Sequence, residues 1–165
     1  MKKALIIIDV QKGFINASTL KIVRNIRDYI KKHSRFYEVV IYTKYYNHKS
    51  SNFVKRFDWH GFMNKEQTNF ADEITEFINN KYVFIKDTYG SFVDNKLMNF
   101  LKKHKIQQVE LAGFDTENCV LTFARDAFDR GFSVVVYKDL TASHSMPKLH
   151  RAALEIIKNN IGEVQ

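Results

Sequence analysis

Short apolar runs alternate with longer stretches of helical period along this chain, and the alternation restricts the folds open to it. The first run, residues 4–8, is unbroken and is followed at once by Asp9. Such a run suits a central parallel strand covered on both faces. Residues 18–32 repeat apolar side chains at helical spacing, which predicts an amphipathic crossover helix. The same criteria predict further strands at 38–43, 82–85, 109–112 and 132–137, and further helices at 70–79, 94–101, 116–130 and 145–157.

Strands that alternate with helices predict an α/β fold. We expect a single three-layer domain over residues 1–165, with a five- or six-stranded, parallel, doubly wound (Rossmann-like) sheet and helices on both faces. At 165 residues and 45% hydrophobic content, the chain is long enough for one such core. No linker or internal repeat interrupts the pattern.

The composition of the chain restricts its expected cellular location and its expected binding partners. A single cysteine cannot form an internal disulfide, and the longest apolar run is far shorter than the roughly 20 residues that cross a bilayer. The first residues lead into a strand-like run and do not resemble a signal sequence. The net charge of +8 is spread over the predicted helices and is not clustered, and no nucleic-acid motif accompanies it. We therefore expect a cytoplasmic protein with no membrane or nucleic-acid partner, whose basic surface draws in anionic molecules.

The only cysteine, Cys119, lies in the stretch with the most chemical character, residues 111–125. A predicted strand ends just before it, and Thr116 is a good N-cap for the helix that follows. Free amides and the positive end of the helix dipole would favour a thiolate there, which makes Cys119 a candidate nucleophile. Taken alone, the position also fits a small buried apolar side chain, the commoner role of a lone cysteine.

Two more reactive side chains are predicted at the same edge of the sheet as Cys119. Asp9 follows the first predicted strand and Lys86 follows the third. In open α/β sheets, ligands bind at the carboxyl ends of the strands, next to the point where the strand order reverses. If the strands of Asp9 and Cys119 are neighbours, their side chains meet at that point. The sequence therefore predicts a site that contains Asp9, Lys86 and Cys119.

Three motifs surround these residues. Residues 8–14 read hydrophobic-Asp-x-Gln-x-x-Phe, residues 86–92 follow Lys-x-x-Tyr-Ser-x-Phe with Gly90 in place of the serine, and residues 113–120 follow Gly-x-x-Thr-x-x-Cys-Val. In these motifs the chain resembles the isochorismatase-like cysteine hydrolases, the superfamily that includes nicotinamidases and N-carbamoylsarcosine amidases. The resemblance extends over nearly the whole chain.

The resemblance implies a nucleophilic mechanism. Asp9 would accept the thiol proton of Cys119, and Lys86 would stabilise the thiolate and hold anionic groups in register. A cis peptide bond is implied between Phe114 and Asp115, and the main-chain N–H groups of Asp115 and Cys119 would form the oxyanion hole. Asp115 stands where the family commonly has a small apolar residue, which would reshape the pocket.

The reaction implied is hydrolysis of a C–N bond in a small amide, ureide or carbamoyl compound through a thioester. Two alternatives stay open at this stage. One is an isochorismatase-type small-molecule hydrolase, whose chemistry in the family does not need the cysteine. The other is a catalytically silent binder of small molecules with the same fold.

Candidate substrate-binding residues are Phe14, Tyr45, Asn47, Trp59 and Tyr89. Three of them fall in or beside residues 44–67, a long stretch without a clean period and rich in aromatic side chains. A connection of this length in a compact domain is usually functional, and we expect a lid or a subunit contact. The resemblance implies a homodimer or a larger homo-oligomer.

A metal ion is not expected. Nicotinamidases carry an Asp-x-His pair shortly after the second strand, and the corresponding positions here are Tyr45 and Asn47. His48 and His60 are nearby but lack a carboxylate partner in the sequence pattern, and scattered histidines are usually surface residues. We therefore expect no metal and no other cofactor, and this argues against nicotinamidase activity.

Overall fold

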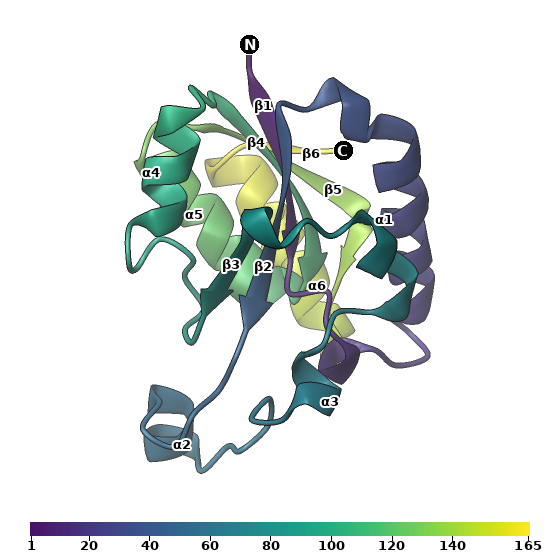
Figure 1. Ribbon diagram of the computed structural model, residues 1–165, viewed down its shortest axis with the longest axis vertical. Helices are drawn as coiled ribbons and strands as arrows, with labels where there is room; N and C mark the ends of the chain where they lie inside the picture. Colours follow the sequence, from purple (N-terminus) through teal and green to yellow (C-terminus); the bar gives the residue numbers. More distant parts are fainter.

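A computed structural model describes residues 1–165. Its centre is a six-stranded sheet in the order β3-β2-β1-β4-β5-β6, in which every neighbouring pair is parallel (Figure 1). This confirms the α/β class and the parallel doubly wound sheet. The strands are β1 (Lys3–Ile8), β2 (Val39–Tyr45), β3 (Val83–Lys86), β4 (Gln108–Phe114), β5 (Ser133–Ala142) and β6 (Glu163–Val164).

Helices cover both faces of the sheet. They are α1 (Leu20–His33), α2 (Asn52–Phe57), α3 (Lys65–Thr68), α4 (Lys96–Lys103), α5 (Leu121–Asp129) and α6 (Pro147–Asn160). Short 3₁₀ helices lie at Lys12–Phe14, Ser34–Phe36, Asp72–Phe77 and Asn80–Tyr82, and a π-helical turn, Thr116–Val120, runs directly into α5. None of the helices has both the length and the apolar composition needed to cross a membrane.

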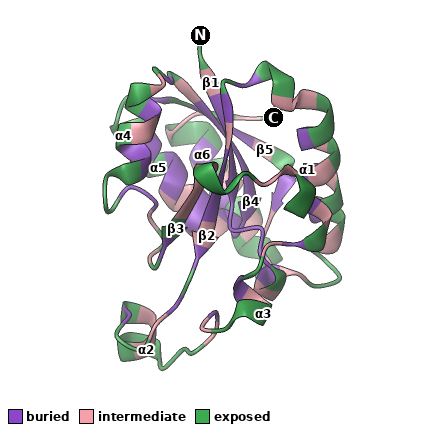
Figure 2. Ribbon diagram, in the orientation of Figure 1, coloured by how far each residue is buried: buried purple, intermediate pink, exposed green.

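Strand β1 lies between the two apolar clusters that form the core. Its alternate side chains enter two apolar clusters: Ala4, Ile6 and Ile8 pack with α4, α5 and α6, whereas Leu5 and Ile7 pack with α1 and the Asp72–Phe77 helix. All five of these side chains are buried (Figure 2). A strand buried on both faces needs the unbroken apolar run that the sequence has.

Gly113 allows β1 and β4 to approach closely. Its φ is +123°, and a Cβ atom there would lie 2.0 Å from the carbonyl oxygen of Ile8. Only glycine fits both the backbone conformation and the space. The close approach sets the end of β1 against the end of β4, immediately before Asp9.

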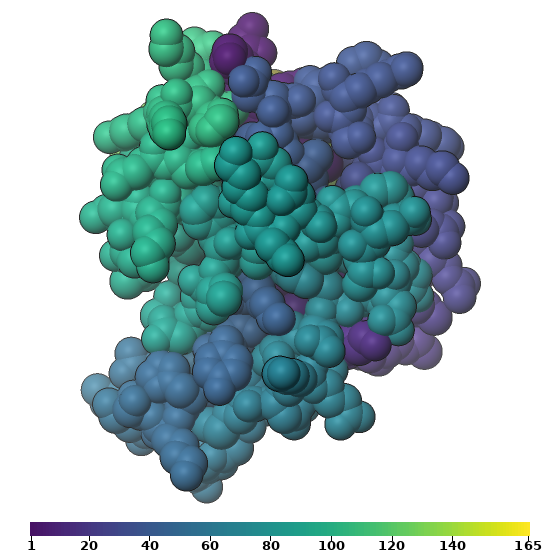
Figure 3. All heavy atoms as spheres, in the orientation of Figure 1, coloured from purple at the N-terminus to yellow at the C-terminus, as the bar shows by residue number.

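Several predicted boundaries were wrong. Residues 72–77 form a 3₁₀ helix instead of part of an α-helix, and Lys86 is the last residue of β3 instead of the residue after it. Strand β5 continues to Ala142, five residues beyond the predicted end. The short strand β6 was not predicted as an element. Within residues 44–67, α2 and its flanking loops project beyond the body of the molecule (Figure 3).

Candidate active site

The strand order reverses between β1 and β4. From β1 the chain continues to β2 and β3 on one side, and β4, β5 and β6 follow on the other. Asp9 comes directly after β1, and Cys119 lies in the π-helical turn that begins two residues after β4. Lys86 ends the edge strand β3, and its side chain reaches back toward the centre. The neighbouring strands predicted for Asp9 and Cys119 are thus found side by side.

The three side chains lie in contact. Lys86 Nζ is 2.7 Å from Asp9 Oδ2 and donates a hydrogen bond to Cys119 Sγ at 3.2 Å. Its third bond goes to the carbonyl oxygen of Thr88 at 3.0 Å. Asp9 is fully buried, and Lys86 and Cys119 are 8% and 6% exposed. One ammonium group therefore bridges a carboxylate and a thiol away from bulk water.

Thr43 orients the carboxylate, a role that the sequence analysis missed. Its Oγ1 donates to Asp9 Oδ1 at 2.7 Å and accepts from the Asp9 N–H at 3.2 Å. Asp9 has a φ of 51°, in the left-handed region that non-glycine residues seldom adopt. Strained backbone of this kind is frequent where a side chain must be aimed at a site.

The surroundings of Cys119 and Lys86 shift the pKa of both side chains upward. Burial raises the pKa of the Cys119 thiol, the Lys86 ammonium opposes this, and the Asp9 carboxylate adds to it, with a net rise. Burial lowers the pKa of Lys86, but the negative charges of Asp9 and Cys119 outweigh it, and the net shift is upward. Desolvation at Cys119 therefore opposes the preference for a thiolate that the start of a helix would give by itself.

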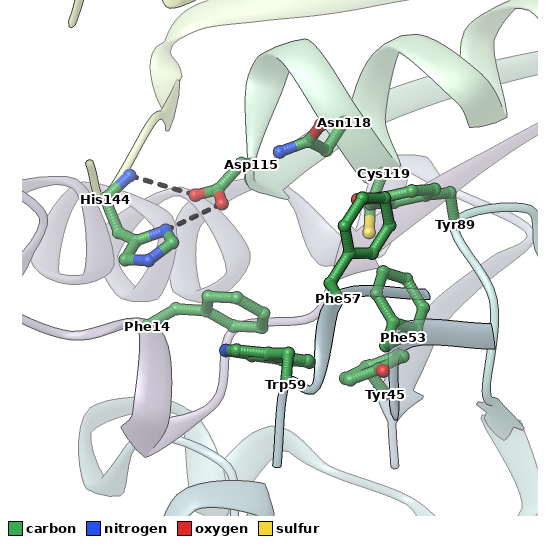
Figure 4. A pocket seen from close by; sticks show the side chains of 10 residues that line it. All are labelled: Phe14, Tyr45, Phe53, Phe57, Trp59, Tyr89, Asp115, Asn118, Cys119 and His144. Carbon is green, nitrogen blue, oxygen red and sulfur yellow. Dashed lines mark hydrogen bonds and ion pairs between the residues drawn. The ribbon is translucent and has the colours of Figure 1, made fainter. Parts of the chain in front are cut away.

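Cys119 opens onto a pocket of about 420 Å³ with mostly aromatic walls (Figure 4). Four of the five predicted substrate-binding residues line it, namely Phe14, Tyr45, Trp59 and Tyr89. The walls that the sequence analysis did not assign are Phe53, Phe57, Asn118, His144 and the side chain of Asp115. Phe53 and Phe57 share one face of α2 at i, i+4 spacing, a signal that the sequence does contain.

Asn47 does not line the pocket, and this prediction was wrong. The side chain is fully buried, and its Nδ2 donates to the carbonyl oxygens of Trp59 and Gly61 at 2.9 and 3.0 Å. Its Oδ1 accepts from the N–H of His48 at 3.0 Å and from Ser51 Oγ at 2.5 Å. All of its hydrogen-bonding capacity is used within the loop, so Asn47 holds the wall that carries Trp59.

Asp115 and His144 form a pair in the pocket wall. His144 Nδ1 lies 2.7 Å from Asp115 Oδ2, and the His144 N–H donates to Asp115 Oδ1 at 2.9 Å (Figure 4). Asp115 is 4% exposed, and the His144 side chain is 37% exposed. The hydrogen bond to Asp115 raises the pKa of His144, and this outweighs the lowering by burial. His144 was missed because β5 extends to Ala142 and carries it to the same sheet edge.

The backbone before Cys119 has one unusual bond. The peptide bond between Phe114 and Asp115 is cis. The Asp115 N–H donates no hydrogen bond within the protein, whereas the Asp115 carbonyl accepts from Asn118 and Val120. A free main-chain donor is thus available at the residue that precedes the turn containing Cys119.

The residues around residue 45 do not fit a metal site of the nicotinamidase kind. His48 Nε2 is 2.9 Å from Asp87 Oδ2, and its Nδ1 contacts Ser50 Oγ. His60 Nε2 pairs with the exposed Asp58 at 2.8 Å. No group of three or more histidine, cysteine or acidic side chains converges as metal ligands. The donor set present therefore offers two separate surface pairs and no coordination sphere.

Comparison with known proteins gives consistent matches. Residues 3–165 match the isochorismatase domain. The isochorismatase family protein YrdC of Bacillus subtilis is 29% identical over 151 residues, which cover 88% of this chain and 76% of that protein. The nicotinamidase/pyrazinamidase of Mycobacterium tuberculosis is 26% identical, over 94% of this chain and 98% of that protein.

Solved structures share the fold over their full length. The nicotinamidase PncA from Bacillus subtilis superposes with a TM-score of 0.87 at 26% identity and covers 99% of both chains. An N-carbamoylsarcosine amidase from Thermoplasma acidophilum gives a TM-score of 0.86 at 24% identity, over 100% of this chain and 96% of that one. Because the domain match extends over nearly every residue, the chain belongs to the isochorismatase family of hydrolases.

Proposed function

We propose that this protein is a cysteine-dependent hydrolase that cleaves a C–N bond in a small amide, ureide or carbamoyl compound through a thioester. The observation that carries the proposal is the Lys86 ammonium, which contacts both the Asp9 carboxylate and the Cys119 thiol beside an aromatic pocket. Amidase and nicotinamidase relatives support the choice of a C–N bond.

In the first step Asp9 removes the thiol proton as Cys119 Sγ attacks the carbonyl carbon. The proton moves from a neutral thiol to a carboxylate, so the negative charge passes from Asp9 to the sulfur and then to the carbonyl oxygen. Lys86 keeps its charge and stays within reach of both acids. The buried site therefore holds one positive and one negative charge throughout the transfer.

The main-chain N–H groups of Asp115 and Cys119 are proposed as the oxyanion hole. Protonated Asp9 then gives its proton to the departing nitrogen as the C–N bond breaks and the thioester forms. Water attacks the thioester with Asp9 as the base, and this releases the acid and restores the thiol. One carboxylate serves both halves of the reaction.

The test is an ammonia-release screen of small primary amides, ureides and carbamoyl compounds, with Cys119→Ala as the blank. Any compound hydrolysed by the wild type should give no ammonia above background with Cys119→Ala. Asp9→Asn and Lys86→Met should lower kcat by roughly 10²- to 10⁴-fold, the usual range for removal of an acid–base group.

Asp94→Asn is the matched control, because Asp94 forms an exposed pair with Lys96 at 2.9 Å and does not line the pocket onto which Cys119 opens. It should keep full activity. Ammonia release that persists in Cys119→Ala would remove the nucleophile from the mechanism. Binding of amides without turnover by the wild type would instead favour the silent binder.

A further inference from the structure

The pocket has a polar end that the proposed reaction does not use. Asp115 and His144 lie on the side away from Cys119, and Asn118 lies between the two ends (Figure 4). Phe14 packs at the edge of the His144 ring, with ring centroids 5.3 Å apart. The imidazole is thus held by one hydrogen bond from Nδ1 to Asp115 and by an aromatic contact, and the main-chain N–H of His144 donates a second hydrogen bond to the same carboxylate.

One nitrogen of this fixed ring is free. Nδ1 is hydrogen-bonded to a carboxylate oxygen, which can only accept. Nδ1 therefore carries a hydrogen in either charge state of the ring. Nε2 makes no hydrogen bond within the protein, and it faces away from Asp115 (Figure 4). The imidazolium therefore offers Nε2–H as a donor to a molecule in the pocket, and the neutral ring offers a lone pair.

The charges around His144 limit which kind of acceptor atom can bind to its Nε2–H. The groups that act on His144 are Asp115 and Glu117, both acidic, and Glu117 is held by Ser143 Oγ at 2.6 Å. The Asp115–His144 pair has no net positive charge even with the ring protonated. A carboxylate placed there would meet two acidic neighbours, whereas an uncharged acceptor gains the hydrogen bond without that repulsion.

We propose that the Asp115–His144 pair is a specificity-determining subsite that donates Nε2–H to an uncharged acceptor atom of the substrate, across the pocket from the carbonyl attacked by Cys119. The inference rests on the proposed function and narrows its substrate class. Aromatic walls at Phe14 and Trp59 suit a flat apolar body. The substrate class is a small, planar, uncharged amide with a second acceptor remote from the bond that breaks.

Aromatic aldehydes can test the subsite before any substrate has been identified. The Cys119 thiol adds to the aldehyde: the S–C bond forms, the thiol proton passes to the oxygen, and nothing leaves. The probes are benzaldehyde, 3- and 4-acetylbenzaldehyde, and 3- and 4-formylbenzoate, which differ in an uncharged or an anionic acceptor. Calorimetric titration gives each Kd in the wild type and in His144→Phe, and the ratio of the two cancels the intrinsic reactivity of each aldehyde.

At least one acetylbenzaldehyde should bind about tenfold more weakly to His144→Phe, the loss expected for a hydrogen bond from a charged donor. Benzaldehyde should bind both proteins equally, and neither formylbenzoate should bind the wild type more tightly than benzaldehyde. His48→Phe is the control, since His48 also pairs with a carboxylate but lies outside the pocket. It should leave every Kd unchanged.

Asp115→Asn supplies a second variant that keeps the ring. In the wild type, acetylbenzaldehyde affinity should fall as His144 loses its proton with rising pH. Without the Asp115 carboxylate this fall should begin at a lower pH. Benzaldehyde is the reference at each pH. Equal acetylbenzaldehyde affinity in the wild type and His144→Phe would overturn the subsite, and so would tight formylbenzoate binding that depends on His144. Undiminished benzaldehyde binding by Cys119→Ala would instead refute the nucleophile, and the His144→Phe comparison would still decide the subsite.

Discussion

Cys119 experiences two opposing influences on its proton. Its place at the start of a helix favours the thiolate, and burial favours the thiol. Burial and the negative charge of Asp9 raise the pKa of Cys119 by more than the Lys86 ammonium lowers it.

This arrangement predicts opposite effects of the two charged neighbours on alkylation. At pH 7, iodoacetamide should modify Cys119 at least about tenfold more slowly than free cysteine, because the raised pKa leaves little thiolate. Lys86→Met should slow the reaction further, and Asp9→Asn should accelerate it. Mass spectrometry of the single cysteine gives the rates.

Lys96→Met is the control for removal of an exposed lysine. An alkylation rate above that of free cysteine in the wild type would mean that the resting site holds a thiolate. Rates unchanged in both Lys86→Met and Asp9→Asn would mean that neither charge acts on the sulfur.

The residues of the site were predictable where strands end in polar side chains. Asp9, Lys86 and Cys119 each follow or end an apolar run, and parallel strands bring such positions to one edge. His144 was not predictable in this way, because the polar residues Lys138 and Asp139 conceal the continuation of β5. Asn47 was misplaced because a buried loop amide and a pocket amide look alike in sequence.

At the scale of elements, the close approach of β1 and β4 sets the geometry of the site. Gly113→Ala should lower the free energy of unfolding by at least about 3 kcal/mol or prevent folding, since the new Cβ meets the Ile8 carbonyl oxygen. Gly131→Ala isolates the backbone contribution, because Gly131 has a φ of +84° and nothing within 4 Å of a new Cβ. It should cost only about 1 kcal/mol.

Urea unfolding of both variants checks this difference. Similar midpoints for Gly113→Ala and Gly131→Ala would show that the two strands can separate to admit a side chain. The close approach would then be a preference of this sequence and not a requirement of the site.

The loop that carries α2 depends on Asn47. Asn47→Ala removes a fully buried side chain and leaves the partly buried carbonyl oxygens of Trp59 and Gly61 without their donor, which should cost about 1 to 3 kcal/mol in unfolding free energy. Because the loop bears pocket walls and not the reacting groups, KM for an amide found in the screen should rise severalfold while kcat stays within about twofold.

Asn99→Ala serves as the control, since Asn99 is exposed on α4. Steady-state kinetics and thermal unfolding give the two readouts. A fall in kcat with unchanged KM in Asn47→Ala would place the loop in the chemical step instead of in binding.

The type and order of most elements could be predicted from apolar period, but their local form depended on tertiary contacts. Residues 72–77 have the apolar spacing of an α-helix. The segment is tied at its start by the hydrogen bond from the Ala71 N–H to the Val10 carbonyl and at its end by one from Tyr42 OH to the Phe77 carbonyl. A 3₁₀ helix has a longer rise per residue than an α-helix, so these six residues cover a greater distance between the two fixed ends.

Across the whole molecule, the principal buried charge outside the site is Glu110. Only 3% of it is exposed, on the face of the sheet covered by α1. Its carboxylate accepts from Tyr37, from Tyr137 at 2.6 Å and from Gln108 at 2.7 Å, and Lys3 Nζ lies 3.1 Å away. These partners lower the pKa of Glu110 even though burial alone would raise it.

A carboxylate with a lowered pKa in the folded state stabilises the fold above its unfolded value, about 4.3, and loses that contribution as pH falls through the folded value. Glu110→Gln should therefore have a lower free energy of unfolding than the wild type at pH 7. The difference in unfolding free energy between the two proteins should narrow below about pH 4. Denaturant unfolding across pH measures it. Glu155→Gln, an exposed substitution on α6, should show no such gap. A gap that stays constant with pH would exclude a charged Glu110.

The proposed reacting groups and three of the aromatic pocket walls belong to separate parts of the backbone. Asp9, Lys86 and Cys119 lie at or just beyond the ends of β1, β3 and β4, whereas Phe53, Phe57 and Trp59 belong to a projecting segment anchored through Asn47 (Figure 3). Transplanting residues 47–61 from a homologue, with the anchoring amide kept, is thus a rational way to change which molecule is hydrolysed while the catalytic apparatus stays intact. The same division gives evolution a region in which new specificities can arise by drift in one loop.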